Sequence, residues 1–239
     1  TNKTKWLMLN SPSNPTGAVY SKDELKNLSK VLLKYPEIYI LTDDIYEKII
    51  YENIEFHTLA SVEPKLKNRI LTLNGVSKTY CMTGWRLGYC GGPKEIIAGM
   101  NKIQSQSNTS TSSISMAAAV EALNGDQDFI TKHNNEFIQR RNLIVKSLNA
   151  IDGISCQIPE GAFYVYPSCA GIIGKKTKKG DTIKNDEDFM NFLLESEGVA
   201  GVHGAAFGLS PYFRLSYATD KNTLIDACER IARACKNLS

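Results

Sequence analysis

The chain contains 239 residues, of which 42% are hydrophobic and 22% charged, a composition typical of a folded globular protein. Its 28 basic and 25 acidic residues leave a net charge of +3, which gives no reason to expect binding to nucleic acid or to a membrane surface. No apolar run is long enough to span a bilayer, and no signal peptide is recognisable. The six cysteines form no CxxC pair, so we expect a cytoplasmic protein with reduced thiols and no metal site.

Strand and helix patterns alternate through the first half of the chain, which is typical of a parallel sheet with helical crossovers. Ser21 and Glu24 form a capping box that marks the start of the first helix. Asn74 and Gly75 are expected to end the third strand. The apolar runs indicate strands at residues 6–9, 38–41, 70–73 and 87–92, and the amphipathic patterns indicate helices at 22–34, 94–103, 116–124 and 128–150.

The first strand begins almost at the start of the sequence. Trp6 to Leu9 is apolar throughout, as expected of a strand buried in the middle of a sheet. A domain rarely begins with such a strand. We therefore expect the sequence to be the C-terminal part of a longer protein.

The pattern changes after Gly153, where short strands that suggest antiparallel pairing replace the alternation. Asp220 is expected to cap a last amphipathic helix. The remaining elements are predicted strands at 154–158, 162–166, 199–202 and 213–217 and a helix at 189–194 that stops by Gly198. The sequence thus predicts an α/β fold with two domains, a larger one with a mostly parallel sheet over residues 1–135 and a smaller α+β one over 136–239.

One strand is followed by two cationic side chains. Lys78 comes just after the strand at 70–73, and Arg86 follows eight residues later. Ligands of open α/β sheets bind outside the carboxyl ends of the strands. There, a lysine and an arginine could combine an amine nucleophile with a phosphate clamp, although a surface lysine on a turn is the commoner occurrence.

Three further stretches carry polar residues of the same kind. Each stretch taken alone is explained equally well by a turn, a helix cap, an ion pair or a charge at a strand edge. The four stretches are Asn14-Pro15-Thr16-Gly17, Asp43-Asp44-Ile45-Tyr46, Ser77-Lys78 with Thr83-Gly84-Trp85-Arg86-Leu87-Gly88, and Tyr212-Phe213-Arg214-Leu215-Ser216-Tyr217. Together, in this order and spacing, they resemble the class I/II pyridoxal-phosphate-dependent aminotransferases of fold type I, and within them the bacterial aspartate aminotransferase group. The resemblance extends from Trp6 to the last helix.

The resemblance implies a role for each matching residue in holding the cofactor, pyridoxal 5'-phosphate. Lys78 would bind its aldehyde as a Schiff base and, once released, move a proton between the substrate and the cofactor. Asp43, preferred over Asp44 because the family pattern is Asp-x-x-Tyr, would pair with the ring nitrogen. Tyr46 and Asn14 would donate hydrogen bonds to the ring oxygen.

The resemblance also implies how the cofactor phosphate and the substrate are held. Arg86 would bind the phosphate through its planar fork, with Ser77 as a weaker candidate for a further phosphate contact. Arg214 would bind the substrate α-carboxylate with the same geometry, and Asn14 would contact that carboxylate too. The implied enzyme is a homodimer that moves an amino group from an L-amino acid, with aspartate as the expected donor, to a 2-oxo acid, with 2-oxoglutarate as the expected acceptor.

Other functions remain open from the sequence. The amino-group acceptor could be an aromatic or prephenate-type acid. The enzyme could also be a C–S lyase or an aminocyclopropane-carboxylate synthase, because these activities would employ Lys78, Asp43 and Arg214 equally well. An aminotransferase-like sensor domain of a transcription regulator is an alternative of another class, and an inactive fragment is a third. In the resembling family, part of the phosphate site precedes the segment that matches Asn14 to Gly17. We therefore expect the 239 residues alone to bind cofactor poorly and to be inactive.

Overall fold

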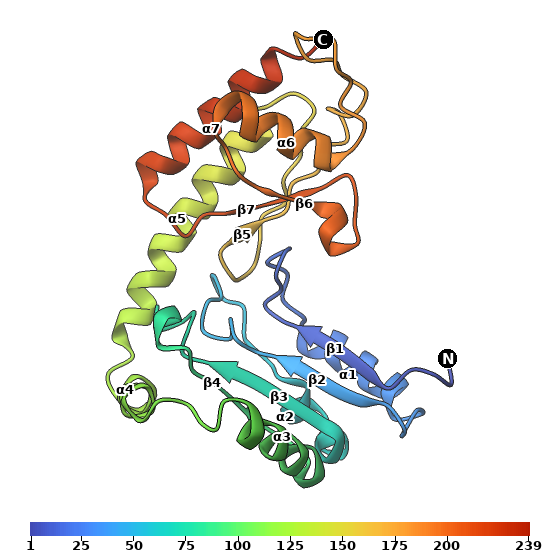
Figure 1. Cartoon of the computed structure of the whole chain (residues 1–239), viewed down its shortest axis with the longest axis vertical. Helices are drawn as coiled ribbons and strands as arrows, with labels where there is room; N and C mark the ends of the chain where they lie inside the picture. The colour runs from blue at the N-terminus through green and yellow to red at the C-terminus, as the bar shows by residue number, and fades with distance from the viewer. The chain divides into compact units, whose positions relative to one another are not determined.

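The computed structural model describes residues 1–239, which form two compact units (Figure 1). Unit 1 comprises residues 1–13 and 18–132, and unit 2 comprises residues 14–17 and 133–239. The division falls within the longest helix, α5 (Asp128–Asn149), which has 22 residues. None of the helices combines the length and the apolar character that crossing a membrane requires.

Unit 1 is built on a four-stranded sheet in the order β1-β2-β3-β4. The first three strands are parallel, and the fourth runs antiparallel to its neighbour, as predicted for a mostly parallel sheet. The strands are β1 (Trp6–Asn10), β2 (Tyr39–Asp43), β3 (Ile70–Gly75) and β4 (Gly88–Gly91). The third strand continues through Asn74 and Gly75, where a break was predicted, because these residues pair with Tyr89 and Gly88 of β4.

Helices and 3-10 turns connect the strands of unit 1. They are α1 (Lys22–Leu32), α2 (Leu59–Val62), η1 (Pro64–Arg69), η2 (Thr83–Trp85), α3 (Lys94–Ser107) and α4 (Ser113–Asn124). The predicted capping box is confirmed, since the Ser21 hydroxyl accepts the N–H of Glu24 and the Glu24 carboxylate accepts the N–H of Ser21 at 2.8 Å. One face of α1 packs with β2, β3, α2 and η1 in a core of buried residues: Leu25, Leu32, Ile40, Leu59, Leu66 and Ile70.

Within this chain the first strand lies at an edge of the sheet, whereas the sequence predicts a buried central strand. β1 pairs with β2 alone. Its Met8 side chain is 72% exposed and Trp6 is 40% exposed. A continuous apolar run therefore marks the strand correctly, but it does not show that both faces of the strand are covered within the chain.

Unit 2 contains a three-stranded antiparallel sheet in the order β5-β7-β6. The strands are β5 (Tyr164–Val165), β6 (Val202–His203) and β7 (Phe213–Ser216), and the helices besides α5 are α6 (Asp186–Glu197), η3 (Gly204–Phe207) and α7 (Lys221–Lys236). This is the smaller α+β arrangement that the sequence predicts. Asp220 caps α7 as expected, accepting the N–H groups of Asn222 and Thr223 at 3.0 Å each.

The strand predicted at 154–158 does not form. Only Ser155 is bridged, to Ser168. The reason is a side chain of α5, because the Asn149 amide donates to the carbonyl of Cys156 at 2.9 Å and accepts its N–H at 2.7 Å. The carbonyl and the N–H of Cys156 are therefore both bonded to Asn149 and are not available to pair with a neighbouring strand.

The segment Asn14–Gly17 belongs to unit 2, whereas the sequence placed it within a domain of residues 1–135. The Gly17 carbonyl accepts the N–H groups of Glu160 and Gly161 at 3.0 and 2.8 Å. Gly17 has φ +71°, and a Cβ on it would lie 2.5 Å from the Cβ of Pro159. Close backbone contact thus requires glycine here and ties the segment to unit 2.

Replacing Gly17 by alanine should therefore destabilise the fold through both backbone strain and a steric clash. We expect Gly17→Ala to lower the free energy of unfolding by about 2–4 kcal/mol, measured by urea denaturation. Gly174→Ala is the matched control, since Gly174 also has positive φ (+93°) but a Cβ there would meet nothing within 4 Å. The control should lose only about 1 kcal/mol, and an equal loss in both variants would show that contact with Pro159 contributes nothing.

Candidate functional site

The carboxyl ends of β2 and β3 bring three of the predicted site residues together. Asp43 is the last residue of β2, and Lys78 follows the end of β3 by three residues. Tyr46 lies three residues beyond Asp43 and is 3% exposed. The Lys78 Nζ atom is 5.8 Å from the centre of the Tyr46 ring. An amine, a carboxylate and a phenol thus gather at this edge of the sheet, where α/β proteins bind ligands.

Charge and burial oppose each other at Asp43. Partial burial is the dominant effect and leaves the pKa of this carboxyl group above its ordinary value. The N–H of Ile45, which donates to Oδ1 at 3.2 Å, and the positive charge of Lys78 both lower that pKa. The lysine is therefore close enough to favour the ionised carboxylate of Asp43.

The neighbouring Asp44 is in a different environment, which supports the choice of Asp43. Asp44 is 5% exposed, and its pKa is raised to about 6, mainly because burial outweighs the lowering effect of a hydrogen bond with the Thr58 side chain. The charges of Glu47 and Asp43 contribute to this rise, and a hydrogen bond with the Thr42 side chain opposes it. Asp44 is thus a buried carboxyl group among other acids, and Asp43 is the one that interacts with Lys78.

The loop that carries Lys78 is fixed at both ends and strained in the middle. Val76 and Leu87 are buried in a small core with Ala119 of α4. Between them, Cys81 and Arg86 have φ of +54° and +51°, a left-handed backbone that costs non-glycine residues about 1 kcal/mol or more each. Such strain persists where the surrounding structure imposes it, often at functional sites.

Arg86 lies on the surface of this loop. One of its guanidinium nitrogens donates to the carbonyl of Thr83 at 2.9 Å, and the residue is exposed. A Cβ on the nearby Gly84 would meet nothing within 4 Å. The structure thus presents the Arg86 guanidinium to the surroundings with its position restrained by one local hydrogen bond.

In unit 2 the structure pairs the other two predicted residues. A guanidinium nitrogen of Arg214, in the central strand β7, donates to the Asn14 side-chain oxygen at 2.8 Å, although the two residues are 200 positions apart. The guanidinium carbon lies 4.8 Å from the Tyr164 ring centre and 5.1 Å from the Phe207 ring centre. Arg214 is therefore held by one amide and two aromatic rings.

Tyr164 and Phe207 were not identified from the sequence. Tyr164 is paired with Ser216, two residues from Arg214 on the same strand, so both side chains are on one face of the sheet. The alternation of side chains within each strand could have indicated which residues share a face. The pairing register between β5 and β7, however, cannot be predicted from the sequence of either strand. Phe207 lies in η3, where no pattern signals contact with β7.

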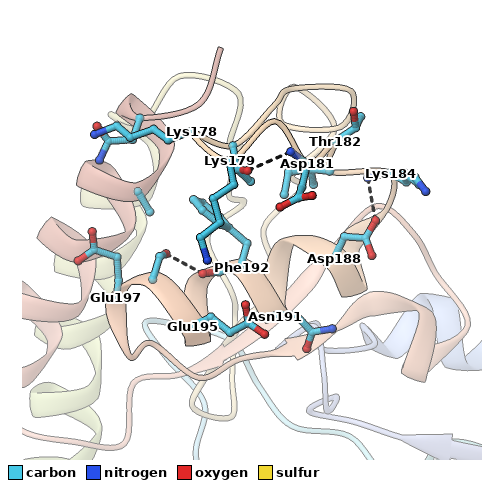
Figure 2. Close-up of a pocket in the computed structure, with 15 residues that line it drawn as sticks. Lys178, Lys179, Asp181, Thr182, Lys184, Asp188, Asn191, Phe192, Glu195 and Glu197 are labelled. Carbon is cyan, nitrogen blue, oxygen red and sulfur yellow. Dashed lines mark hydrogen bonds between the residues drawn. The ribbon is translucent and has the colours of Figure 1, made fainter.

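A cavity of about 530 Å³ lies elsewhere in unit 2 (Figure 2). It is formed by the loop at 177–184 and by residues of α6 and α7, and it contains none of the predicted site residues. Two of its acidic side chains already have protein partners, because Asp188 accepts the N–H of Lys184 at 2.9 Å and Glu197 binds Arg233. No group of three or more potential ligands in the chain could hold a metal ion.

Comparison with known proteins extends over the whole chain. The family model for aminotransferase class I and II matches residues 1–231. Aspartate aminotransferase from Rhizobium meliloti is 55% identical over 239 residues, which cover 100% of this chain and 58% of that relative. An aspartate/prephenate aminotransferase from Cereibacter sphaeroides is 52% identical over 239 residues, with coverage of 100% and 60%.

Solved structures agree with the sequence matches. The crystal structure of aspartate aminotransferase from Rhizobium meliloti superposes with a TM-score of 0.97 at 55% identity, covering 100% of this chain and 60% of that one. An aromatic aminotransferase from Pyrococcus horikoshii gives 0.87 at 34% identity, with coverage of 99% and 61%. These matches confirm the predicted fold.

The chain spans about 58–60% of the length of the curated relatives named above. Which part of those relatives it corresponds to stays a prediction. The family match covers far more than half of the residues, and the structural likeness extends from end to end. The chain therefore belongs to the class I and II aminotransferase family.

Proposed function

We propose that the chain carries the lysine, the ring-binding groups and both arginines of a pyridoxal-phosphate-dependent aminotransferase. Aspartate is the expected amino donor and 2-oxoglutarate the expected acceptor. The observation that carries the proposal is the convergence of Lys78, Asp43 and Tyr46 at one end of parallel strands. A lysine on an ordinary surface turn would have no need of a carboxylate and a phenol beside it.

The residues of unit 1 fit the chemical groups of the cofactor that the family uses. Lys78 offers an amine for its aldehyde, and Asp43 a carboxylate for its ring nitrogen. Tyr46 offers a phenol for its ring oxygen, and Arg86 a planar guanidinium for its phosphate. When bound, the cofactor ring accepts the electron pair left at the substrate Cα as the proton departs.

Each protein group then has a defined task. Asp43 must be ionised to keep a proton on the ring nitrogen, and the charge of Lys78 and the N–H of Ile45 favour that form, against the burial that raises its pKa overall. The partly buried position strengthens this charge interaction relative to water. Lys78 Nζ, once released from the cofactor, is the base that takes the proton from the substrate Cα.

Unit 2 provides the groups for the substrate carboxylate. A guanidinium binds a carboxylate through two parallel N–H···O bonds. In Arg214 the contact with Asn14 uses one nitrogen and helps to orient the plane of the fork. The Tyr164 and Phe207 rings restrict that plane further, so less rotational freedom is lost when a carboxylate binds.

The names of the relatives guide the choice of substrate. Aspartate aminotransferase and aspartate/prephenate aminotransferase both occur among them, so a prephenate-type acceptor is the second candidate. None of the relatives named above is a lyase or a transcription regulator. The homodimer and the inactivity of the isolated 239 residues stay proposals that rest on the resemblance, and the cytoplasmic location stays a proposal that rests on the cysteine pattern.

The role of Lys78 can be tested by chemical trapping. Borohydride is added to the chain with pyridoxal phosphate, and the labelled peptides are identified by mass spectrometry. We expect labelling to be weak overall but to occur preferentially at Lys78, because its amine lies beside the ring-binding groups. Lys78→Arg should remove that label.

Two outcomes of the trapping experiment would contradict the proposals. Label spread over the lysines at 175–179, with none at Lys78, would refute the role of Lys78. Efficient labelling of Lys78 together with transaminase activity would refute the inactivity of the isolated chain.

The two adjacent aspartates form a matched pair of variants. Asp43→Asn should weaken cofactor trapping at Lys78 by about tenfold or more, because a charged hydrogen bond contributes about 1.5–3 kcal/mol. Asp44→Asn should leave trapping unchanged. The reverse result would exchange the roles of the two residues.

Asp44 should instead control how stability depends on pH. Its pKa is raised to about 6 in the folded chain from an ordinary value of 3.8, so the folded state holds the proton more tightly. The free energy of unfolding should therefore fall by up to about 3 kcal/mol as the pH rises from 4 to 6. Urea denaturation across this range should show a flatter profile for Asp44→Asn, and an unchanged profile would refute the raised pKa.

Arg86 can be tested by comparing two forms of the cofactor. Arg86→Lys keeps the charge but loses the fork, so trapping of pyridoxal phosphate should weaken by about tenfold. Trapping of pyridoxal, which has no phosphate, should be the same in the variant and the parent chain. Equal weakening with both aldehydes would mean that Arg86 supports the loop and does not bind phosphate.

A further inference from the structure

A buried carboxylate in unit 2 has no task in the proposed reaction. Asp186, the first residue of α6, is 1% exposed. Its Oδ2 accepts the N–H of Ala205 at 2.7 Å, and its side chain also bonds to the side chain of Ser210. Both partners lie in residues 204–212, which connect β6 to β7 and which we call the η3 segment.

The surroundings of Asp186 favour the charged form. Burial raises the pKa of Asp186, but the bonds from Ser210 and Ala205 and the proximity of His203 together hold it below its ordinary value. Asp186 Oδ1 and His203 Nδ1 are both buried without a hydrogen-bond partner. A charged group is therefore kept inside the unit, facing the η3 segment, at a cost that an apolar residue would not incur.

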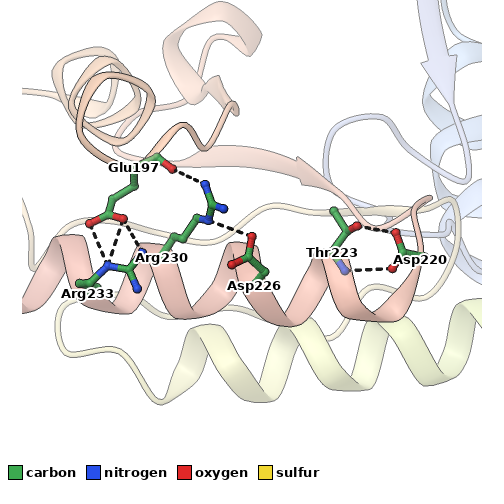
Figure 3. Close-up of polar contacts among 6 residues, drawn as sticks. All are labelled: Glu197, Asp220, Thr223, Asp226, Arg230 and Arg233. Atoms are coloured by element: carbon green, nitrogen blue, oxygen red, sulfur yellow. Dashed lines mark hydrogen bonds and ion pairs between the residues drawn. The ribbon is translucent and has the colours of Figure 1, made fainter.

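The helix that carries Asp186 is firmly held at its other end (Figure 3). The Glu197 carboxylate accepts from two nitrogens of Arg233, the closest contact being 2.7 Å. Arg230 donates to the Glu197 carbonyl at 3.0 Å and pairs with Asp226 at 2.8 Å. Asp186 is thus an anchor on a helix that is itself fixed to α7.

The η3 segment connects this anchor to the substrate-binding arginine. Phe207 lies in the segment with its ring centre 5.1 Å from the Arg214 guanidinium carbon. The same ring meets Tyr166 edge-on at 6.0 Å, and the Tyr166 hydroxyl contacts the carbonyls of Gly204 and Leu209 at 3.3 and 3.1 Å. The segment is therefore held by Tyr166 on the sheet side and by Asp186 on the helix side.

We propose that Asp186 is a positioning residue for Arg214, acting through the η3 segment. By fixing Ala205 and Ser210 it places Phe207 against the guanidinium, which Tyr164 and Asn14 also contact. An arginine restricted in this way loses less rotamer freedom on binding a carboxylate. The inference rests on the proposed role of Arg214 and extends it to residues that do not touch the substrate.

Two measurements on the chain test the proposal. The first is the NMR shift of the Arg214 Nε–H, which we expect the ring currents of Tyr164 and Phe207 to displace even without a ligand. The second is the dissociation constant for succinate, used as a dicarboxylate probe and followed by titration. The variants are Asp186→Asn, Asp186→Ala, Ser210→Ala and Arg214→Lys, with Asp188→Asn as the matched control. Asp188 lies in the same turn of α6 but accepts from Lys184 and not from the η3 segment.

We expect both Asp186 variants to move the Arg214 resonance toward the shift of a free arginine and to weaken succinate binding about three- to tenfold. Ser210→Ala should have a smaller effect in the same direction, and it provides the test if Asp186→Ala does not fold. Asp188→Asn should change neither measurement. Asp186 and Ser210 variants that behave like Asp188→Asn would overturn the proposal.

The same experiment separates this proposal from the proposed function. If Arg214→Lys leaves succinate binding unchanged, Arg214 does not bind the carboxylate and the proposed function loses its substrate site. The Arg214 shift in the Asp186 variants would still show whether Asp186 positions the guanidinium. A shift in those variants without weaker succinate binding would overturn the link to binding.

Discussion

The register between β2 and β3 is the constraint on which the cofactor side of the site depends. Asp43 pairs with Leu73, five residues before Lys78, and this pairing places the carboxylate within the influence of the amine. Side chains along a strand alternate between faces, so a slip of one residue would exchange Asp43 and Asp44. Asp44 would then meet the lysine, and Asp43 would be buried among acids.

The core of unit 1 fixes this register. Ile40, Thr42 and Asp44 alternate as buried residues, and the Thr42 hydroxyl bonds to that of Thr72 on the adjacent strand at 3.1 Å. Ile40 packs in the same cluster as Ile70 of β3. The apolar core therefore does more than stabilise the sheet, because it decides which of two adjacent carboxylates interacts with Lys78.

Local features of the fold could be predicted from the sequence, and contacts between distant segments could not. The capping box at Ser21, the cap at Asp220 and the periodicity of α5 involve neighbouring residues, so their patterns are complete within one segment. The loss of the strand at 154–158 depends on Asn149 in another element. In the same way, the motifs single out Lys78 and Arg214 as candidate site residues, while the rings around Arg214 come from segments without a recognisable pattern.

The two arginines of the candidate site are held by different physical means. Arg86 has a left-handed backbone conformation and lies between the buried residues Val76 and Leu87. Its position therefore depends on the small core that these two residues form, although Arg86 itself is not part of that core. Arg214 lies in a regular strand and is oriented by side chains, namely Asn14 and two rings. A change in the core of unit 1 should therefore disturb Arg86 through the backbone. The orientation of Arg214 depends instead on the contacts that position Phe207. In our proposal, Asp186 of α6 provides two of those contacts, and it thereby affects the binding of a substrate carboxylate that it does not touch.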